Sequence, residues 1–497
     1  MDPGLITIIL FGFMLALLAS GLWIAISLMA VGFLALEVFS SAPAGSLLAT
    51  TVWDASWNWA LTALPLFIWM GEILFRSRLS ADMFNGLAPW LSWLPGRLLH
   101  VNIVGCGVMA AVAGSSAVTC ATVARMSIPE LRKRGYDESL SIGTLAGSGT
   151  LGLLIPPSIM LIVYGVIAQV SISRLFMAGV FPGILLISLF MAYVMIWSLI
   201  YPGKTPKSDI SLTRADLAFL ALEVVLIAML WAFAGSLADL ALWMSKGIAA
   251  GNPEFDDDSI TGGTVVFVLG LAGTIALAQI STRTKLLVPV LCLITAVLGS
   301  IYGGVATPTE AATIGVIGAL VLAAASGSLN WQTFVDSLMG AMRTACMISF
   351  ILVGAAFLSI AMGFTGIPRA LATLVENMNL SPYMLLAALT LLYIVLGCFL
   401  DGVSMMVVSA SVVLPMVQNA GIDLLWFGIY IVVVVEMAQI TPPVGFNLFV
   451  LQSMTGRDIM QVTRAAMPFF GLMLLGIVIL TAFPSIATFL PNLMVGR

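Results

Sequence analysis

The stretch VEMAQITPPVGFNLF, residues 435–449, lies inside an apolar segment long enough to cross a membrane, yet it contains a carboxylate, an amide, a threonine and two adjacent prolines. Two consecutive prolines remove two amide donors and clash with the preceding turn, so a continuous helix cannot pass through them. In lipid, the carbonyl groups freed in this way need another partner because no water is available. A single break is compatible with a simple kink, whereas a second copy of it in the chain would favour a functional role.

The composition is that of a polytopic membrane protein. The chain has 497 residues, of which 61% are hydrophobic and 8% are charged, and its mean hydropathy is +1.13. A soluble globular chain carries about 25% charged residues. The first residues lack the basic region of a cleavable signal peptide and lead directly into an apolar segment, so we expect the first helix to remain.

The side-chain chemistry argues against an enzyme. His100 is the only histidine, so neither a histidine cluster for zinc nor a hydrolytic triad is available. The cysteines lie in apolar runs without CxxC spacing, and we interpret them as small core residues: Cys106, Cys120, Cys292, Cys346 and Cys398. We therefore expect no catalytic residues, and we expect no nucleic acid among the partners.

Two of the apolar segments are interrupted in a way that predicts re-entrant hairpins. Residues 98–124 contain AGSSAVTCA and have basic residues on both flanks, and residues 384–417 contain LDGVSMM. A segment that enters the membrane and returns to the same side explains this pattern better than a crossing does. With these two as hairpins, hydropathy and the distribution of Lys and Arg predict about twelve crossings with both termini outside.

The double proline has a second copy. Shifting the chain by 286 positions aligns Pro129 with Pro415, and it aligns the Pro156–Pro157 pair with Pro442–Pro443. The first copy of the break reads GSGTLGLLIPPS and follows its own hairpin. The positive-inside rule places the two copies in opposite orientations, so we predict an inverted repeat.

The predicted organisation has three parts: a first repeat at 1–203, a connecting insert with two further helices at 204–284, and a second repeat at 285–497. Each repeat contains scaffold helices, one hairpin and one broken helix. The hairpins are predicted at about 98–130 and about 384–417, and the broken helices at about 140–169 and about 426–452.

The broken helices predict a joint site for an anion and for cations. Their N-termini carry partial positive charge that attracts an anionic group, whereas free carbonyls and Ser or Thr hydroxyls coordinate a small cation. Charged residues in membrane segments are functional by default, because each costs about 2.5–3.5 kcal/mol to insert. Within or near apolar segments, these charges are Glu72, Arg125, Glu310, Asp401 and Glu436.

Some of these charges have alternative structural roles. Glu310 ends the motif TPTE, which places Thr at an N-cap and Pro at the first helical position, so we favour a helix cap there. Asp401 could cap a hairpin helix, and Glu436 could pair with a polar neighbour. The sequence leaves both of these residues open.

These motifs together resemble the large membrane subunit of tripartite ATP-independent periplasmic (TRAP) transporters. The stretches that carry the resemblance are GGVATPTEAA at residues 303–312, AGSSAVT at the first hairpin tip, IPPS after the first break and ITPPVGFNLF at the second. The similarity covers both repeats. The insert at 204–284 is longer than the family's usual connection between halves, so its contacts stay open.

The resemblance implies an elevator-type ion-transporter-like fold in the bacterial inner (cytoplasmic) membrane. It implies a secondary transporter that uses sodium ions to import small organic anions, such as dicarboxylates and other carboxylates. A periplasmic binding protein would deliver the substrate, and a small membrane subunit would be a permanent partner. A stand-alone sodium-coupled anion symporter is the nearer alternative. An ion channel is the alternative from another class, although inverted broken repeats favour alternating access.

The resemblance and the repeat also assign binding residues. The first sodium site is expected from Ser115, Ser116 and the carbonyls of Gly152, Ile155 and Pro157. By the 286 shift, the second sodium site is expected from Asp401, Gly402, Ser404, Ala438, Thr441 and Pro443. The substrate site is predicted from Ser116, Thr119, Ser158, Ser404 and Asn447.

A tryptophan-rich stretch predicts a surface for the small subunit. Residues 51–65 read TVWDASWNWALTALP, and amphipathic aromatic side chains anchor at membrane interfaces. An ordinary aromatic belt that faces lipid is the alternative for this stretch.

Overall fold

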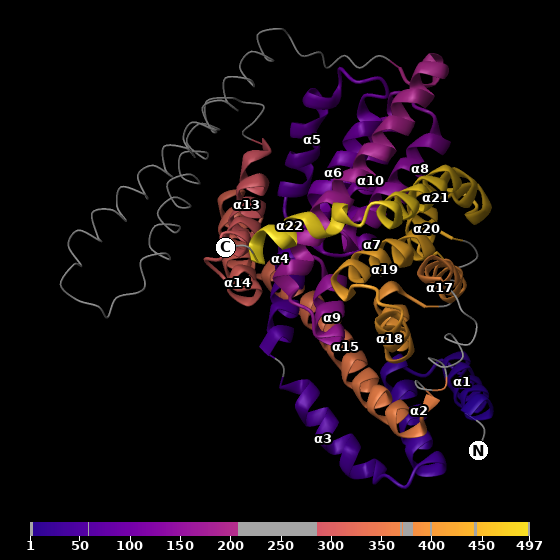
Figure 1. Ribbon diagram of the computed structural model, residues 1–497. Helices are drawn as coiled ribbons and strands as arrows, with labels where there is room; N and C mark the ends of the chain where they lie inside the picture. Colours follow the sequence, from indigo (N-terminus) through magenta and orange to yellow (C-terminus); the bar gives the residue numbers. More distant parts are fainter. Residues whose placement is uncertain are drawn as a thin grey trace, which may run out of the picture.

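The computed structural model describes residues 3–57, 59–206, 286–367, 370, 381–397, 400–441 and 445–495. Every regular element in these ranges is a helix (Figure 1), which confirms the predicted all-α class. Apart from residues 204–206, the predicted insert at 204–284 lies outside the described residues. The prolines of the second break, Pro442 and Pro443, also lie outside them.

The first half of the chain contains the following helices in order: α1 (Pro3–Ala19), α2 (Ile24–Phe39), α3 (Ala44–Ser56), η1 (Trp59–Thr62), α4 (Ala63–Arg76), α5 (Leu79–Leu91), α6 (Leu98–Ala113), α7 (Ser116–Lys133), α8 (Glu138–Gly149), η2 (Thr150–Leu153), α9 (Ile159–Ala168), α10 (Ile172–Ile200) and η3 (Pro202–Lys204). The elements labelled η are short 3-10 helices.

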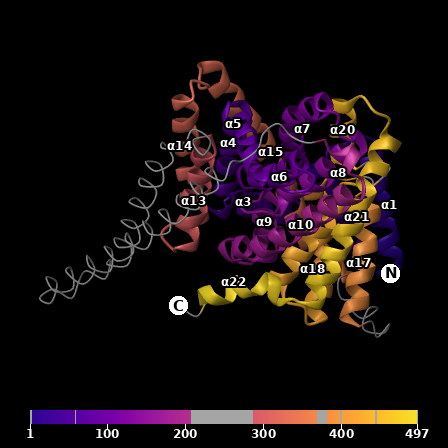
Figure 2. The same cartoon turned by 90° about the horizontal axis from the view of Figure 1, so that it is seen from above.

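The described helices of the second half are α13 (Val288–Tyr302), α14 (Pro308–Ala325), α15 (Trp331–Thr365), α17 (Pro382–Leu396), α18 (Gly402–Asn419), α19 (Leu424–Ala438), α20 (Phe446–Thr455), α21 (Ile459–Ala482) and α22 (Ser485–Val495). Figure 2 shows α13 and α14 on one side of the molecule and α17, α20 and α21 on the opposite side, with α6 and α9 between them.

Both long and half-length apolar helices are present. In the described part of the chain, α10, α14, α15, α18 and α21 are each long and apolar enough to cross a membrane. By contrast, α9 has 10 residues and α19 has 15. Ten helical residues extend about 15 Å, half of a hydrocarbon core of about 30 Å. A helix as short as α9 fits a chain that is interrupted at mid-depth.

Helices α6 and α7 pack against each other and are joined by a tight turn at Gly114 and Ser115. Gly114 is the C-cap of α6 and has a φ of 58°, a left-handed conformation that glycine adopts without strain. The amide of Ile159 donates a hydrogen bond of 3.4 Å to the Gly114 carbonyl. The hairpin tip is thereby tied to the start of α9.

The first broken helix consists of α8, the short turn η2 and α9, which begins just after Pro156 and Pro157. Ser158 caps α9, because its hydroxyl oxygen accepts the amide of Leu161 at 3.3 Å. The same hydroxyl donates to the carbonyl of Leu153. A carbonyl freed by the break therefore has a protein partner, as the membrane interior requires.

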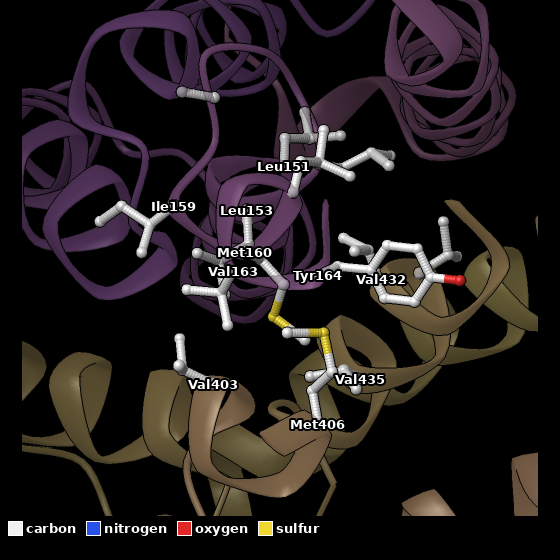
Figure 3. Packing of buried hydrophobic residues seen from close by; sticks show 14 of the residues in the cluster. Leu151, Leu153, Ile159, Met160, Val163, Tyr164, Val403, Met406, Val432 and Val435 are labelled. Carbon is white, nitrogen blue, oxygen red and sulfur yellow. The ribbon is translucent and has the colours of Figure 1, made fainter. Parts of the chain in front are cut away.

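An apolar core joins the two halves around the breaks (Figure 3). Leu153 and Met160 of the first half face Val403, Met406 and Val435 of the second half, and all five are buried. Burial of a large aliphatic side chain contributes about 1.5–3 kcal/mol in water-soluble proteins. In lipid, close packing between the helices carries more of this role.

Two sequence interpretations can be checked away from the breaks. Thr307 and Glu310 form a capping box at the start of α14, which confirms the structural role that we favoured for Glu310. The interpretation of every cysteine as a core residue is wrong for Cys346. This residue is exposed on α15, whereas Cys106, Cys120 and Cys292 are buried. An apolar helix in a membrane can expose a small residue to lipid at little cost, because lipid is as apolar as a protein core.

A cluster of ion pairs joins α7, α8 and the turn before α21. Glu138, the first residue of α8, accepts hydrogen bonds from Arg457 and from Arg132, the latter at 2.6 Å. The hydrogen bond from Arg457, supported by that from Arg132, holds the pKa of Glu138 below its usual range. All three side chains are partly exposed.

The substitution Glu138→Gln should lower the free energy of unfolding by no more than about 1 kcal/mol at neutral pH, because a partly exposed pair is screened. The folded pKa is depressed, so this stabilisation is present above the unfolded value of about 4.3 and is lost as pH falls through the folded pKa. Thermal unfolding in detergent should show a difference between wild type and variant at neutral pH that shrinks in acid. An equal difference in both conditions would contradict this account.

Candidate functional site

The first hairpin tip rests directly on the first break. A Cβ atom placed on Gly152 would lie 2.6 Å from the carbonyl carbon and oxygen of Ser115 and 2.7 Å from the Cα of Ser116. A Cβ on Gly114 would lie 3.1 Å from the carbonyl oxygen of Pro157. The structure therefore brings the two serines close to the Gly152 and Pro157 segments of the predicted first sodium site.

The same tip also reaches the second half of the chain. The hydroxyl of Ser116 donates a hydrogen bond to Oε1 of Glu436, near the end of α19. Glu436 is 1% exposed, and its Oε2 atom has no hydrogen-bond partner. None of the ion pairs of the described residues involves Glu436. A buried carboxylate without a cationic side chain beside it is costly, so a bound cation would stabilise it.

The second hairpin tip makes the reciprocal contacts. A Cβ atom on Gly402 would lie 2.6 Å from the side-chain nitrogen of Gln439 and 3.0 Å from Val435, both beside the second break. It would also lie 3.5 Å from Leu153 of the first break. Each tip therefore touches both breaks, and the four segments meet at one place.

The structure describes part of the predicted second sodium site. Asp401 is the N-cap of α18, where its carboxylate accepts the amide of Ser404 at 3.3 Å and also the Ser404 hydroxyl. Across from this tip, the Thr441 hydroxyl donates to the carbonyl of Ala438 at 2.6 Å. Because that hydroxyl is used as a donor, its oxygen lone pairs are free to accept or to coordinate. Pro443 lies outside the described residues.

Of the five predicted substrate residues, Ser116 donates to Glu436 in the other half of the chain, and the remaining four fall into two groups. Ser158 and Ser404 already bond to their own segments as described above. By contrast, the hydroxyl of Thr119 on α7 and both side-chain polar atoms of Asn447 on α20 are buried without any hydrogen-bond partner. Helices α7 and α20 pack against each other. Buried polar groups in proteins are normally hydrogen-bonded, so unpaired ones indicate a ligand or water.

Ile155 is placed differently from the other predicted sodium ligands. Its side chain packs toward Gly183 of α10, because a Cβ on that glycine would lie 2.9 Å from Ile155 Cγ1. The Ile155 side chain therefore serves packing, and the ligand predicted for sodium at this residue is its backbone carbonyl.

One site residue was not assigned from the sequence. Glu436 was noted as a charge near the site, but its contact with Ser116 joins residues of different repeats and was not predicted. The 286 shift does carry a signal, since it pairs Glu436 with the uncharged Thr150 and so marks an added charge at this break.

A large cavity lies away from these residues. Its volume is about 630 Å³, and α3, α9, α15 and α18 contribute its walls, with Asp54, Gln169, Ser359 and Gln418 among its polar residues. None of the predicted sodium or substrate residues lines it.

Known proteins resemble this chain over most of its length. The family model described as tripartite ATP-independent periplasmic transporter, DctM component, matches residues 11–486. The C4-dicarboxylate TRAP transporter large permease protein DctM of Pseudomonas aeruginosa is 28% identical, over 90% of this chain and 89% of that protein. The ectoine TRAP transporter large permease protein TeaC of Halomonas elongata is 27% identical, over 87% of this chain and 86% of that protein.

A solved structure supports the fold independently. The YdaH transporter of Alcanivorax borkumensis superposes with a TM-score of 0.53 and 16% identity, covering 90% of each chain. At this identity the likeness concerns the fold alone. The chain, a multi-pass membrane protein, belongs to the family of DctM components of tripartite ATP-independent periplasmic transporters.

Proposed function

We propose that the chain is the permease of a sodium-driven secondary transporter that imports a small organic anion across the bacterial inner membrane. The observation that supports it most is the buried carboxylate of Glu436 against Ser116, where both tips and both breaks meet. A desolvated carboxylate, hydroxyls and free carbonyls are hard oxygen ligands of the kind that small cations prefer. The unpaired side chains of Thr119 and Asn447 offer donors and acceptors to an organic anion.

The proposed substrate class follows from the relatives' names together with the site. C4-dicarboxylate and ectoine are small organic molecules, so the class is broader than dicarboxylates. We propose a small carboxylate-bearing compound. A periplasmic binding protein would select it, and a small membrane subunit would complete the transporter.

We further propose that the two halves are inverted repeats and that the hairpins and broken helices move together. The 286 shift in sequence supports the repeat. The contacts of Gly152 and Gly402, together with the hydrogen bond from Ser116 to Glu436, support a common moving unit, because they pack each tip against both breaks. Such a unit suits alternating access around one central site better than it suits a continuous pore.

The substitution Thr441→Val tests the second sodium site. Valine keeps the shape and removes the hydroxyl, which in a desolvated site weakens binding by about 1–3 kcal/mol. Uptake into proteoliposomes should then need about tenfold to hundredfold more sodium. The control Thr313→Val removes a similar intrahelical hydroxyl from α14 and should leave the curve in place. A Thr441→Val curve that overlays wild type would remove this residue from the ion site.

The first site is tested in the same assay by Ser115→Ala combined with Ser116→Ala. We expect a higher sodium requirement here too, and unchanged sodium dependence would show that this assignment is wrong. Uptake that persists without the binding protein would instead favour the stand-alone symporter. Flux that does not saturate with substrate would favour a channel.

The proposed surface for the small subunit can be probed at α3 and η1. Trp53, Trp57 and Trp59 are 71%, 83% and 75% exposed, so a partner or lipid can cover them. A cysteine at Trp53 or Trp57 should crosslink to the small subunit in membranes that contain both chains. A cysteine at Trp331, which is 79% exposed on α15, serves as the comparison site. Crosslinks that never capture the small subunit from α3 would assign these rings to the lipid-facing belt.

A further inference from the structure

A second polar feature lies on α7, away from the meeting point of the tips. A cleft of about 580 Å³ is lined mainly by one face of α7, including Arg125, Arg132 and Lys133, and by Met454 of α20. Small-molecule sites have volumes of about 300–1,000 Å³. None of the described residues that line this cleft is acidic. The large cavity described above has the opposite charge, since its described lining includes Asp54 and no Lys, Arg or His.

Arg125 and Lys133 are the basic residues of this cleft that form no ion pair among the described residues. Lys133 is the last residue of α7, whereas Arg125 lies within the helix and nearer the hairpin tip. Arg132 is held by Glu138 at 2.6 Å, whereas none of the ion pairs in the described part of the chain involves Arg125. The guanidinium of Arg125 instead lies 5.4 Å from the centre of the Phe75 ring on α4. A ring contact orients the guanidinium and leaves its edge donors available for a planar carboxylate.

The position of Arg125 along α7 points to a transported anion. Nine residues separate it from Ser116 at the hairpin tip, about 13 Å along the helix axis. It also lies eight residues, about 12 Å, inside the helix end at Lys133. Arg125 therefore lies about midway between the hairpin tip and the end of α7 that the positive-inside rule assigns to the cytoplasm.

We propose that the cleft beside Arg125 binds the carboxylate group of a small organic anion as it leaves the transporter on the cytoplasmic side. This inference rests on the proposed direction of transport, but the binding chemistry does not. Arg125 supplies paired N–H donors to the carboxylate, and Arg132 and Lys133 raise the local concentration of anions at the mouth of the cleft.

The test uses a cysteine reporter in the cleft and requires no transport. Met454→Cys is introduced into the full chain with Cys346→Ser and Cys398→Ala, and the protein is placed in phosphatidylcholine nanodiscs. Two thiol reagents of similar size are compared, an anionic sulfonatoethyl and a cationic trimethylammonioethyl methanethiosulfonate. We expect Arg125→Gln to reduce the ratio of anionic to cationic reaction rates about tenfold, and Arg125→Lys to restore most of it. Succinate, the probe anion, should slow the anionic reagent only when position 125 is basic.

The matched control is Arg464→Gln, which removes an exposed arginine of α21 outside the cleft and should leave the ratio unchanged. Pro129→Cys, exposed at the same cleft, is the second reporter if the first variant does not fold. An unchanged ratio in Arg125→Gln would overturn the proposal. So would a ratio that responds only to added phosphatidylglycerol, with no protection by succinate, because the cleft would then be a lipid site. If Arg125→Gln lowers the ratio as expected but wild-type protein shows no sodium-driven uptake, the proposed transport is refuted and the proposed anion site is still supported.

Discussion

Replacing Gly152 with alanine should reduce substrate uptake about tenfold to hundredfold, because overpacking of a close contact costs about 1–3 kcal/mol. The added Cβ would lie 2.6 Å from the carbonyl carbon and oxygen of Ser115. These are backbone atoms, so the clash cannot be relieved by rotating a side chain. The first hairpin tip must move away from the break, and the proposed cation site opens with it. Initial uptake rates in proteoliposomes, normalised to inserted protein, give the measurement.

The control for this substitution is Gly471→Ala. Gly471 lies within α21, and no atom lies within 4 Å of the Cβ that alanine would add. An alanine in an open helical position is neutral or stabilises by about 0.4–1 kcal/mol. Wild-type uptake in Gly152→Ala would mean that the tip need not rest on the break for transport.

The second large effect is expected at Glu436. Glu436→Ala leaves the Ser116 hydroxyl without its acceptor and removes the proposed ligand of the cation. A buried polar group left unsatisfied costs about 1–3 kcal/mol, so uptake should fall about tenfold to hundredfold. Glu436→Gln keeps the size and can still accept from Ser116, so it isolates the negative charge. We expect this variant to fold normally. Its uptake should need at least about tenfold more sodium than wild-type uptake does.

Glu37→Gln is the matched control, since Glu37 is an exposed carboxylate on α2. Sodium titrations of uptake compare wild type, Glu436→Gln and Glu37→Gln. If Glu436→Gln follows the wild-type curve, the carboxylate serves only as the hydrogen-bond acceptor of Ser116, and the charge has no part in ion binding.

The breaks and hairpins are predictable because their causes are local. Two adjacent prolines such as Pro156 and Pro157 interrupt a helix because of their own chemistry, and Gly114 permits the tight turn between α6 and α7. Thr307 and Glu310 are only three residues apart, so their cap is visible in the sequence. Comparing the chain with itself reveals the second copy of the break, which a short stretch of sequence taken alone cannot show.

The arrangement of the site is less predictable because its contacts are distant in sequence. Ser116 and Glu436 are 320 residues apart, and their contact depends on how helices of two halves are rotated against each other. Hydrophobic periodicity does not set that rotation in a membrane, where helices are apolar on most sides. The unpaired state of Thr119 and Asn447 likewise emerges only when every neighbour is in place. The cap of Asp401 on Ser404 is local by contrast, and the sequence already offers it as one of the alternatives for this residue.

The central claim is that sodium enters together with the organic anion, and radioactive sodium uptake tests it most directly. Proteoliposomes that contain the chain and its small membrane subunit are supplied with substrate-loaded binding protein, and entry of both labels is followed in parallel. We predict that sodium influx rises when substrate is added, in a constant ratio to substrate influx, and that Glu436→Ala abolishes both fluxes together. Substrate influx at the wild-type rate without any accompanying sodium would contradict the account.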